Sequence, residues 1–179
     1  AFFDDYFLYE KTPNCTIISS GYYKIEEIGE LIKNSKYRNK GYFHNILLNR
    51  VVRAYYRYCR NENFDYILFV PPTISGDLVE NFAQRISQKI NIPFSKDLIK
   101  IKETEIPLKE AQSKLQKKKL LKDIFRLKNT DKYAGKNILL IDDIIDSGTT
   151  INEISKLLLK CGVKKVCALT IAKTNVGDE

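Results

Sequence analysis

The sequence predicts an α/β fold with a mainly parallel central sheet, and three observations lead to this prediction. Two apolar runs, residues 66–70 and 138–141, have strand length and are rich in branched or aromatic side chains, as expected of strands buried on both faces. Each run is followed by a short polar loop and then by a segment with apolar residues at helical spacing. A further strand is predicted over residues 164–172, directly after the second of these helices. Alternating strands and helices are typical of such sheets.

The first sixty residues contain two predicted short strands and two predicted helices. Residues 1–20 alternate aromatic and polar side chains around Thr12-Pro13-Asn14, which predicts two strands joined by a turn. We expect this segment to be either an edge strand or a docking surface. The spacing of apolar residues predicts helices over residues 24–35 and 42–61.

The second of these helices has a basic face and an apolar face. The apolar face consists of Leu47, Leu48, Val51, Tyr55, Tyr58 and Cys59, and the basic face of Arg50, Arg53, Arg57 and Arg60. Arginines interleaved with tyrosines can follow a nucleic-acid backbone and stack on bases. The more common arrangement is a solvated helical face whose tyrosines pack into the core, and we favour it here.

Residues 66–91 form the first strand–loop–helix unit. Pro71 and Pro72 end the strand, and Asp77 followed by Glu80 resembles a capping box at a helix start. Apolar residues at helical spacing then extend to Asn91. In a parallel sheet this loop would lie at the same edge as the loop after residues 138–141, the edge where ligands bind.

Residues 93–101 predict a third short strand, after which the composition changes. Residues 102–128 contain nine basic and four acidic side chains. We consider two interpretations: a flexible basic flap that closes over the site and excludes water, or a solvated amphipathic helix. In the second interpretation the inward-facing residues are Leu115, Leu120, Leu121 and Phe125.

Length and composition indicate one domain over residues 1–179. The apolar fraction of 44% is ordinary for a globular protein, and we see no membrane span and no signal peptide. Four scattered cysteines and a single histidine, His44, argue against a zinc site and predict reduced thiols in a cytoplasmic protein. The net charge of +8 favours polyanionic partners, either nucleic acid or a pyrophosphorylated substrate.

Residues 138–150 carry the clearest chemical signal. The apolar run ends at an acidic pair, Asp142 and Asp143, and the small polar loop after it opens a helix. The start of a helix offers unpaired backbone N–H groups to an anion, Gly148 permits close approach, and hydroxyl side chains add donors. Two carboxylates suit sugar hydroxyls or a metal-bound sugar. The pattern therefore favours a phosphorylated sugar over an ordinary strand that ends in a solvated turn with a helix cap.

These thirteen residues resemble the phosphoribosyl-pyrophosphate (PRPP) signature of type I phosphoribosyltransferases. The chain is further similar to the ComF-like branch, including the ComF-like domains appended to some RecQ-type DNA helicases. The segments that carry this similarity are 28–37, Phe69-Val-Pro-Pro-Thr-Ile-Ser-Gly-Asp-Leu-Val79, 100–104, Gln112, Phe125 and 135–174. The resemblance implies the type I fold, with helices flanking the sheet, a small hood and a basic flexible flap over residues 102–135. The chain departs from these relatives in having no N-terminal cysteine module and in having Leu120 where the flap usually has asparagine.

The resemblance also assigns roles to individual residues. Asp142 and Asp143 are expected to bind the ribose, and also Mg²⁺ through water, with Mg²⁺ accompanying PRPP as cofactor. Asp146 is the candidate general base, and the alternative is that it orders the loop by accepting hydrogen bonds from backbone amides. The predicted 5′-phosphate loop comprises Asp146, Ser147, Gly148, Thr149 and Thr150, and the predicted pyrophosphate loop comprises Pro72, Thr73, Ile74 and Ser75. For that second loop, a plain strand-to-helix turn remains the alternative.

Three functions remain open at this stage. The first is Mg²⁺-dependent transfer of phosphoribose from PRPP to an unidentified base or amine. The second is a non-catalytic PRPP- or nucleotide-sensing module in DNA metabolism, in DNA uptake, helicase-linked repair or a phage-defence complex. The third is an accessory subunit of a larger defence or repair assembly, with the aromatic N-terminus as its docking surface. The partners considered are PRPP or a related phosphorylated ribose, DNA, a homodimer and a larger protein assembly.

Overall fold

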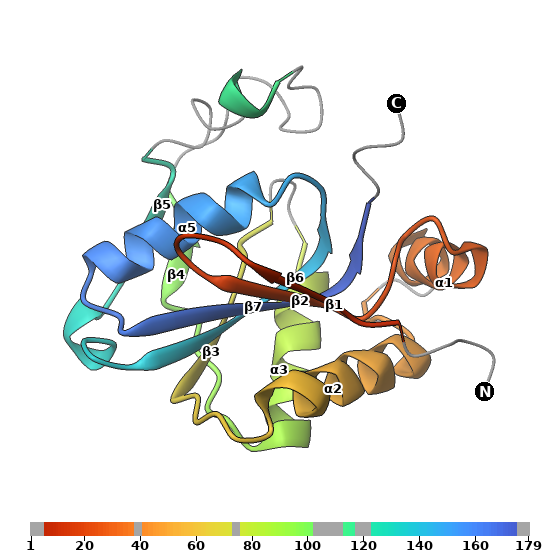
Figure 1. Cartoon of the computed structure of the whole chain (residues 1–179), viewed down its shortest axis with the longest axis horizontal. Coiled ribbons are helices and arrows are strands. Elements are labelled where there is room, and N and C mark those ends of the chain that lie inside the picture. Colours follow the sequence, from red (N-terminus) through yellow and green to blue (C-terminus); the bar gives the residue numbers. More distant parts are fainter. Residues whose placement is uncertain (1–5, 38–40, 73–75, 102–112, 117–122, 175–179) are drawn as a thin grey trace.

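The structure is a computed structural model that describes residues 6–37, 41–72, 76–101, 113–116 and 123–174. Its main sheet has five strands in the order β1-β2-β7-β6-β3. Three of the four ladders, β2–β7, β7–β6 and β6–β3, are parallel. Helices α2 and α3 cover one face of the sheet and α5 covers the other (Figure 1). The prediction of an α/β fold with a mainly parallel sheet is confirmed.

The chain begins with the predicted pair of strands. Strands β1 (Leu8–Lys11) and β2 (Thr16–Ser19) pair antiparallel, and β1 lies at the edge of the sheet. The turn between them is closed by the Thr12 backbone N–H, which donates to the Cys15 carbonyl at 2.8 Å. Because β2 pairs with β7 along its other side, the N-terminal segment belongs to the same sheet as the signature strand.

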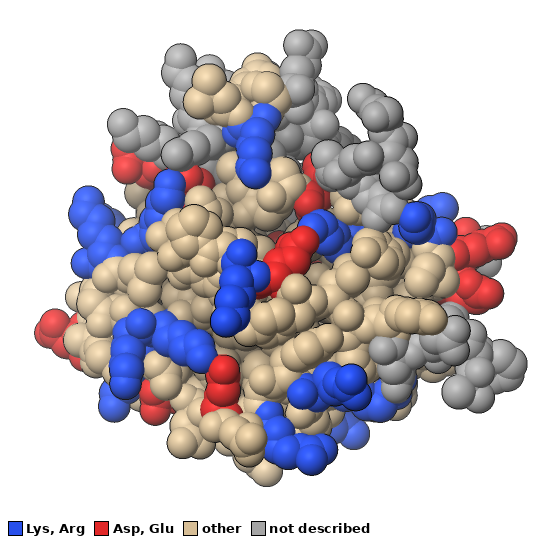
Figure 2. Space-filling model, in the orientation of Figure 1, with Lys and Arg blue, Asp and Glu red and all other residues tan. Residues whose placement is uncertain are grey.

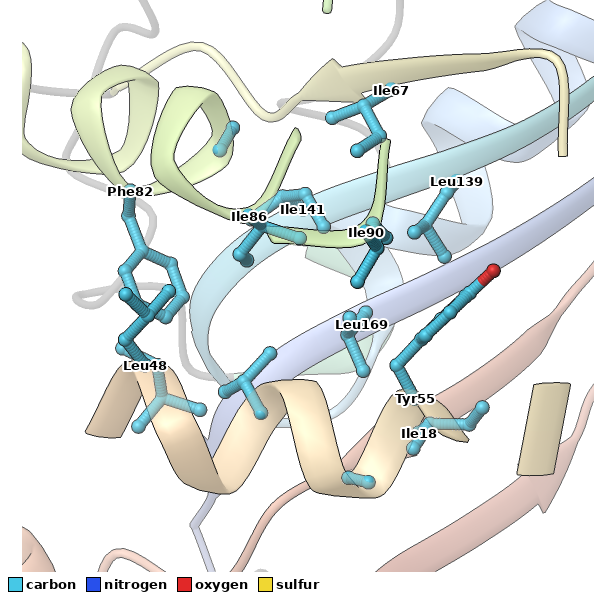
Figure 3. Packing of buried hydrophobic residues seen from close by; sticks show 14 of the residues in the cluster. Ile18, Leu48, Tyr55, Ile67, Phe82, Ile86, Ile90, Leu139, Ile141 and Leu169 are labelled. Atoms are coloured by element: carbon cyan, nitrogen blue, oxygen red, sulfur yellow. The ribbon is translucent and has the colours of Figure 1, made fainter. Parts of the chain in front are cut away.

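Helices α1 (Glu26–Tyr37) and α2 (Asn45–Cys59) follow. The predicted apolar residues of α2 are buried except Tyr58, which is half-buried. Phe82, Ile86 and Ile90 of α3 (Leu78–Ile90) are buried as well. The strands contribute Ile67 and the odd-numbered residues Leu139, Ile141 and Leu169 to the same cluster (Figure 3). The predicted basic face needs one correction: Arg50 is only 1% exposed and donates to the Ser20 carbonyl at 2.5 Å. Arg53, Arg57 and Arg60 are exposed.

The second strand–loop–helix unit lies beside the first. Strand β3 (Tyr66–Phe69) pairs with β6 (Asn137–Ile145), and α5 (Thr149–Lys160) and β7 (Lys165–Lys173) complete the fold. The predicted capping box before α3 is wrong. The Asp77 side chain makes no capping hydrogen bond within the part of the chain that the structure describes, and Glu80 instead pairs with Lys96 at 3.3 Å.

A small second sheet pairs β4 (Leu98–Lys100) antiparallel with β5 (Phe125–Leu127). Phe125 therefore belongs to a strand and not to the amphipathic helix that we considered. The alternation of buried Phe125, exposed Arg126 and buried Leu127 follows the two-residue period of a strand. Leu115 is 76% exposed and does not face inward. Leu120 and Leu121, and most of the predicted flap, lie outside the described residues.

Strand β6 is longer than its apolar run predicts. It continues through Asp142 and Asp143 to Ile145, because β7 supplies a partner along the whole length and pairs Asp142 with Thr170 and Ile145 with Lys173. Residues Ile138 to Ile141 are fully buried, as expected of a central strand. The acidic pair is thus part of the sheet and not of the loop after it.

Burial of Arg50 predicts a contrast between two arginines of α2. Arg50→Ala should lower the free energy of unfolding by about 2–3 kcal/mol, since it removes a charge-assisted hydrogen bond from a buried carbonyl. The matched control Arg57→Ala, at an exposed position, should change it by less than about 0.5 kcal/mol. Urea unfolding of both variants measures the difference, and equal losses would contradict the buried position of Arg50.

Candidate functional site

The candidate site lies at the carboxyl edge of the parallel strands. Because β3 and β6 pair in parallel, with Phe69 opposite Ile141, the loops that follow them start from the same edge. The sheet becomes polar at this edge. The Ser19 and Thr170 hydroxyls are 2.8 Å apart and buried, and Thr170 pairs in register with Asp142.

The loop between β6 and α5 is closely braced. Gly148 occupies the N-cap position with φ +77°, a left-handed conformation that L side chains rarely adopt. The Ser147 and Thr149 hydroxyls are 2.7 Å apart, and the Asn152 backbone N–H donates to the Gly148 carbonyl at 2.9 Å. The predicted glycine, hydroxyl side chains and helix start therefore come together within one turn of chain, an arrangement suited to binding an anion.

Asp146 and Thr150 complete the predicted phosphate loop. Asp146 is exposed, and its carboxylate accepts a hydrogen bond of 2.9 Å from the Thr174 hydroxyl after β7. Thr150 lies in the first turn of α5 and is half-buried. The first residue of the loop, Asp146, is thus held in place by Thr174, which directly follows β7. Its role as general base stays a prediction.

The acidic pair is held at the end of the sheet by backbone and side-chain contacts. The Asp142 carboxylate accepts from the Asp143 backbone N–H at 2.8 Å, and the Asp143 carboxylate accepts from the Ile144 N–H at 2.6 Å. Burial, together with the adjacent Asp143 carboxylate, raises the pKa of Asp142 well above its ordinary value. Two neighbouring acids in such a setting favour a ligand that brings positive charge or hydroxyl donors.

Lys36 is part of this site, although sequence analysis gave it no role. Its ammonium lies 2.9 Å from the Asp143 carboxylate, and the two side chains are 33% and 20% exposed. Lys36 belongs to the last turn of α1, which lies at the same end of the sheet as the end of β7 (Figure 1). The only sequence signals were the basic stretch from Lys33 to Lys40 and the inclusion of this segment in the family resemblance. Neither signal indicated a partner.

Oxygen donors of the acidic pair fit a magnesium ion. Among the described residues no three His, Cys, Asp or Glu side chains gather as a metal-binding group. An ion held by Asp142 and Asp143, directly or through water, would therefore complete its shell with water and substrate oxygens. This is the usual arrangement for Mg²⁺ bound together with a phosphorylated substrate.

A cavity of about 670 Å³ borders the loop on the side of the N-terminal hairpin. Its wall includes Ser147, Gly148 and Thr149 of the loop, and it does not include the acidic pair. Asn14 of the hairpin turn donates to Asn152 of α5 at 2.9 Å, which fastens the hairpin to this helix. The other lining residues are Glu10, Lys11, Thr12, Pro13, Asn14, Ile17, Lys114, Leu115, Asn152, Glu153 and Lys156.

The predicted pyrophosphate loop is described only in part. Pro71 is buried and Pro72 is exposed at the end of β3. Thr73, Ile74 and Ser75, which carry the predicted donors, lie outside the described residues. The structure therefore describes the acidic pair and the predicted 5′-phosphate loop along one strand–loop–helix unit, and the phosphate and pyrophosphate contacts both stay predictions.

The raised pKa of Asp142 predicts a stabilising substitution within the site. A carboxyl that binds its proton more tightly in the folded than in the unfolded protein costs stability as pH rises above its ordinary pKa of 3.8. Asp142→Asn should therefore raise the thermal midpoint at pH 7, with a gain that shrinks towards pH 4. The control Asp131→Asn, at an exposed position, should change little at either pH. A lower midpoint for Asp142→Asn at pH 7 would contradict this prediction.

Comparison with known proteins yields several similarities. Competence protein F of Haemophilus influenzae is 27% identical over 168 residues, which cover 86% of this chain and 70% of that protein. A purine phosphoribosyltransferase structure from Pyrococcus horikoshii aligns with a TM-score of 0.47 and 16% identity, covering 75% of this chain and 88% of that chain.

The glutamine PRPP amidotransferase from B. subtilis aligns with a TM-score of 0.45 and 20% identity over 68% of this chain. This chain spans 24% of that larger protein. A family model described as the phosphoribosyl transferase domain matches residues 47–179, which include β3, β6, α5 and the whole signature loop. The similarity to competence protein F agrees with the predicted ComF-like branch, and the family model shows that the chain belongs to the phosphoribosyltransferase family.

Proposed function

We propose that this protein binds PRPP together with Mg²⁺ and transfers its phosphoribosyl group to a base or amine. The observation that carries the proposal is the placement of two carboxylates near the end of β6, two residues before the braced loop that opens α5. This arrangement offers acceptors for sugar hydroxyls beside donors for a phosphate. Membership of the phosphoribosyltransferase family supports the same ligand.

Each part of the site has a distinct task in this proposal. Asp142 and Asp143 accept hydrogen bonds from the ribose hydroxyls, and residues 146–150 bind the 5′-phosphate through backbone N–H groups and the hydroxyls of Ser147 and Thr149. Asp142 and Asp143 would hold Mg²⁺, directly or through water, and the ion would supply positive charge that offsets the charge of the pyrophosphate. The hydrogen bonds that already fix the loop reduce the ordering required when the ligand binds.

Transfer would break the bond between the sugar C1 and pyrophosphate and form a bond from C1 to the acceptor nitrogen. Positive charge develops on the sugar, and the nearby carboxylates stabilise it. Asp146 would accept the proton that the nitrogen loses, which requires its carboxylate to exchange the Thr174 hydroxyl for the acceptor. Pyrophosphate would leave towards the loop of Pro72, Thr73, Ile74 and Ser75, under the basic segment 102–128.

The direct test is calorimetric binding of PRPP with Mg²⁺. The double substitution Asp142→Asn and Asp143→Asn should weaken binding at least about tenfold, because each amide is a poorer acceptor and carries no charge. Circular dichroism of the variant shows whether the fold is retained. Unchanged affinity in a folded variant would remove the basis of the proposal.

A matched pair of glycine substitutions tests the phosphate loop. Gly148 and Gly135 both have positive φ, +77° and +73°, and Gly135 lies before β6 at the opposite end of that strand. Replacement by alanine should cost about 1 kcal/mol of stability at either position, through backbone strain. PRPP affinity, measured by calorimetry, should fall only in Gly148→Ala. Equal affinities in the two variants would argue against phosphate binding at this loop.

The alternative, a non-catalytic sensing module in DNA metabolism, has less support from the structure. Burial of Arg50 reduces the exposed basic face of α2 to Arg53, Arg57 and Arg60. Lys and Arg side chains are interspersed with acidic ones over the face in Figure 2 and do not merge into one basic patch there. This distribution suits local contacts to a small anion better than a continuous path for a DNA backbone.

A cytoplasmic location belongs to the same proposal. All four cysteines are free thiols, and Cys15, Cys59 and Cys167 are buried, as is usual in a reducing compartment. In the described part of the chain, no helix combines the length and the apolar character needed to cross a membrane.

A further inference from the structure

Lys36 is held in place by the way in which α1 joins α2. Ile28 and Ile32 anchor one face of α1 in the core, each with 1% of its surface exposed. The Ser35 hydroxyl donates to the Leu31 carbonyl at 2.7 Å and accepts from the His44 N–H at 3.0 Å. The last turn of α1 is therefore fastened to the start of α2. The backbone of Lys36, the next residue, is therefore held in a fixed position, and its side chain extends from there to Asp143 of β6.

The ion pair of Lys36 with Asp143 differs from an ordinary surface pair. Its nitrogen–oxygen distance is 2.9 Å, and both side chains are at least two-thirds covered. On the same helix, Lys33 and Glu30 lie 3.6 Å apart, with 53% and 56% of their side chains exposed. Exposed pairs contribute little because water screens them, whereas a partly covered pair keeps more of its attraction. The Lys36 contact is thus the better candidate for a functional one.

The location of this contact matters more than its strength. The Asp143 carboxylate is close enough to Asp142 to oppose its ionisation, so negative charge is concentrated where a strongly anionic ligand would bind. Lys36 places one positive charge at this point, and Asp143 engages one of the three donors of its ammonium group.

We propose that Lys36 is a built-in counter-cation of the carboxylate pair, which holds Asp143 as an acceptor for ribose hydroxyls and allows phosphoribose binding without a divalent ion. This inference rests on the proposed function and adds a positioning residue to it. When Mg²⁺ is present, the ion supplies the positive charge, and the contribution of Lys36 to affinity becomes smaller.

The experiment compares PRPP affinity in EDTA and in millimolar Mg²⁺ for four proteins. These are the unmodified chain, Lys36→Gln, Lys36→Arg and the control Lys33→Gln. Lys36→Gln should weaken binding about tenfold in EDTA, or about 1.4 kcal/mol, and less than about threefold with Mg²⁺. Lys36→Arg, which keeps the charge, and Lys33→Gln should stay within about twofold in both conditions. A purely structural role for Lys36 would instead produce the same loss in both conditions.

A second measurement does not depend on PRPP. Binding of Mn²⁺ alone, followed by electron paramagnetic resonance, should be tighter in Lys36→Gln than in the unmodified chain by about three- to tenfold, since a competing cation has gone. Lys33→Gln should leave Mn²⁺ affinity unchanged.

The outcomes separate the two proposals. If the unmodified chain binds no PRPP in either condition, the proposed function fails and this inference fails with it. If PRPP binds only with a divalent ion, or if Lys36→Gln matches the unmodified chain in EDTA, the inference alone is overturned. Equal Mn²⁺ affinities would also overturn it.

Discussion

The parallel ladder between β6 and β7 is the constraint on which the candidate site depends. It extends from Asn137 opposite Lys165 to Ile145 opposite Lys173. Because β7 is long enough to pair with residues beyond the apolar run, the acidic pair is part of a strand with an ordered backbone. The loop after Ile145 then starts from a fixed position at the edge of the sheet. There the Thr174 hydroxyl donates a hydrogen bond to the Asp146 carboxylate. A shorter β7 would leave these residues on a loose turn.

Two hydrophobic clusters keep this ladder in place. The cluster on the α2 and α3 face contains Leu139, Ile141 and Leu169, and the cluster on the α5 face contains Ile138, Leu140 and Ala168. Successive residues of β6 thus alternate between the two clusters, so slipping its register by one position would exchange every contact. The buried apolar residues of β6 stabilise the strand, so that the residues at its end can be polar and charged without loss of the fold.

The site itself is less favourable for stability than the sheet below it. Asp142 has a raised pKa because burial and Asp143 both oppose its ionisation, and Lys36 offsets part of this cost. Such unfavourable charge arrangements are common where a protein binds a ligand or catalyses a reaction. Here the counter-charge comes from α1, a helix outside the strand–loop–helix units. The site is therefore assembled from more of the chain than its signature.

The amino-acid sequence by itself determined the α/β class, the two buried strands and the loop that carries the family signature. These features are encoded locally, in apolar runs, helical spacing and a Gly148 that permits a left-handed backbone. Only the tertiary structure decided that Arg50 is buried, that Phe125 pairs in a second sheet, that β6 continues through Asp142 and Asp143, and that Lys36 meets Asp143. Each of these depends on a partner from a distant part of the chain. Spacing along the sequence does not encode such partners, because packing brings them together.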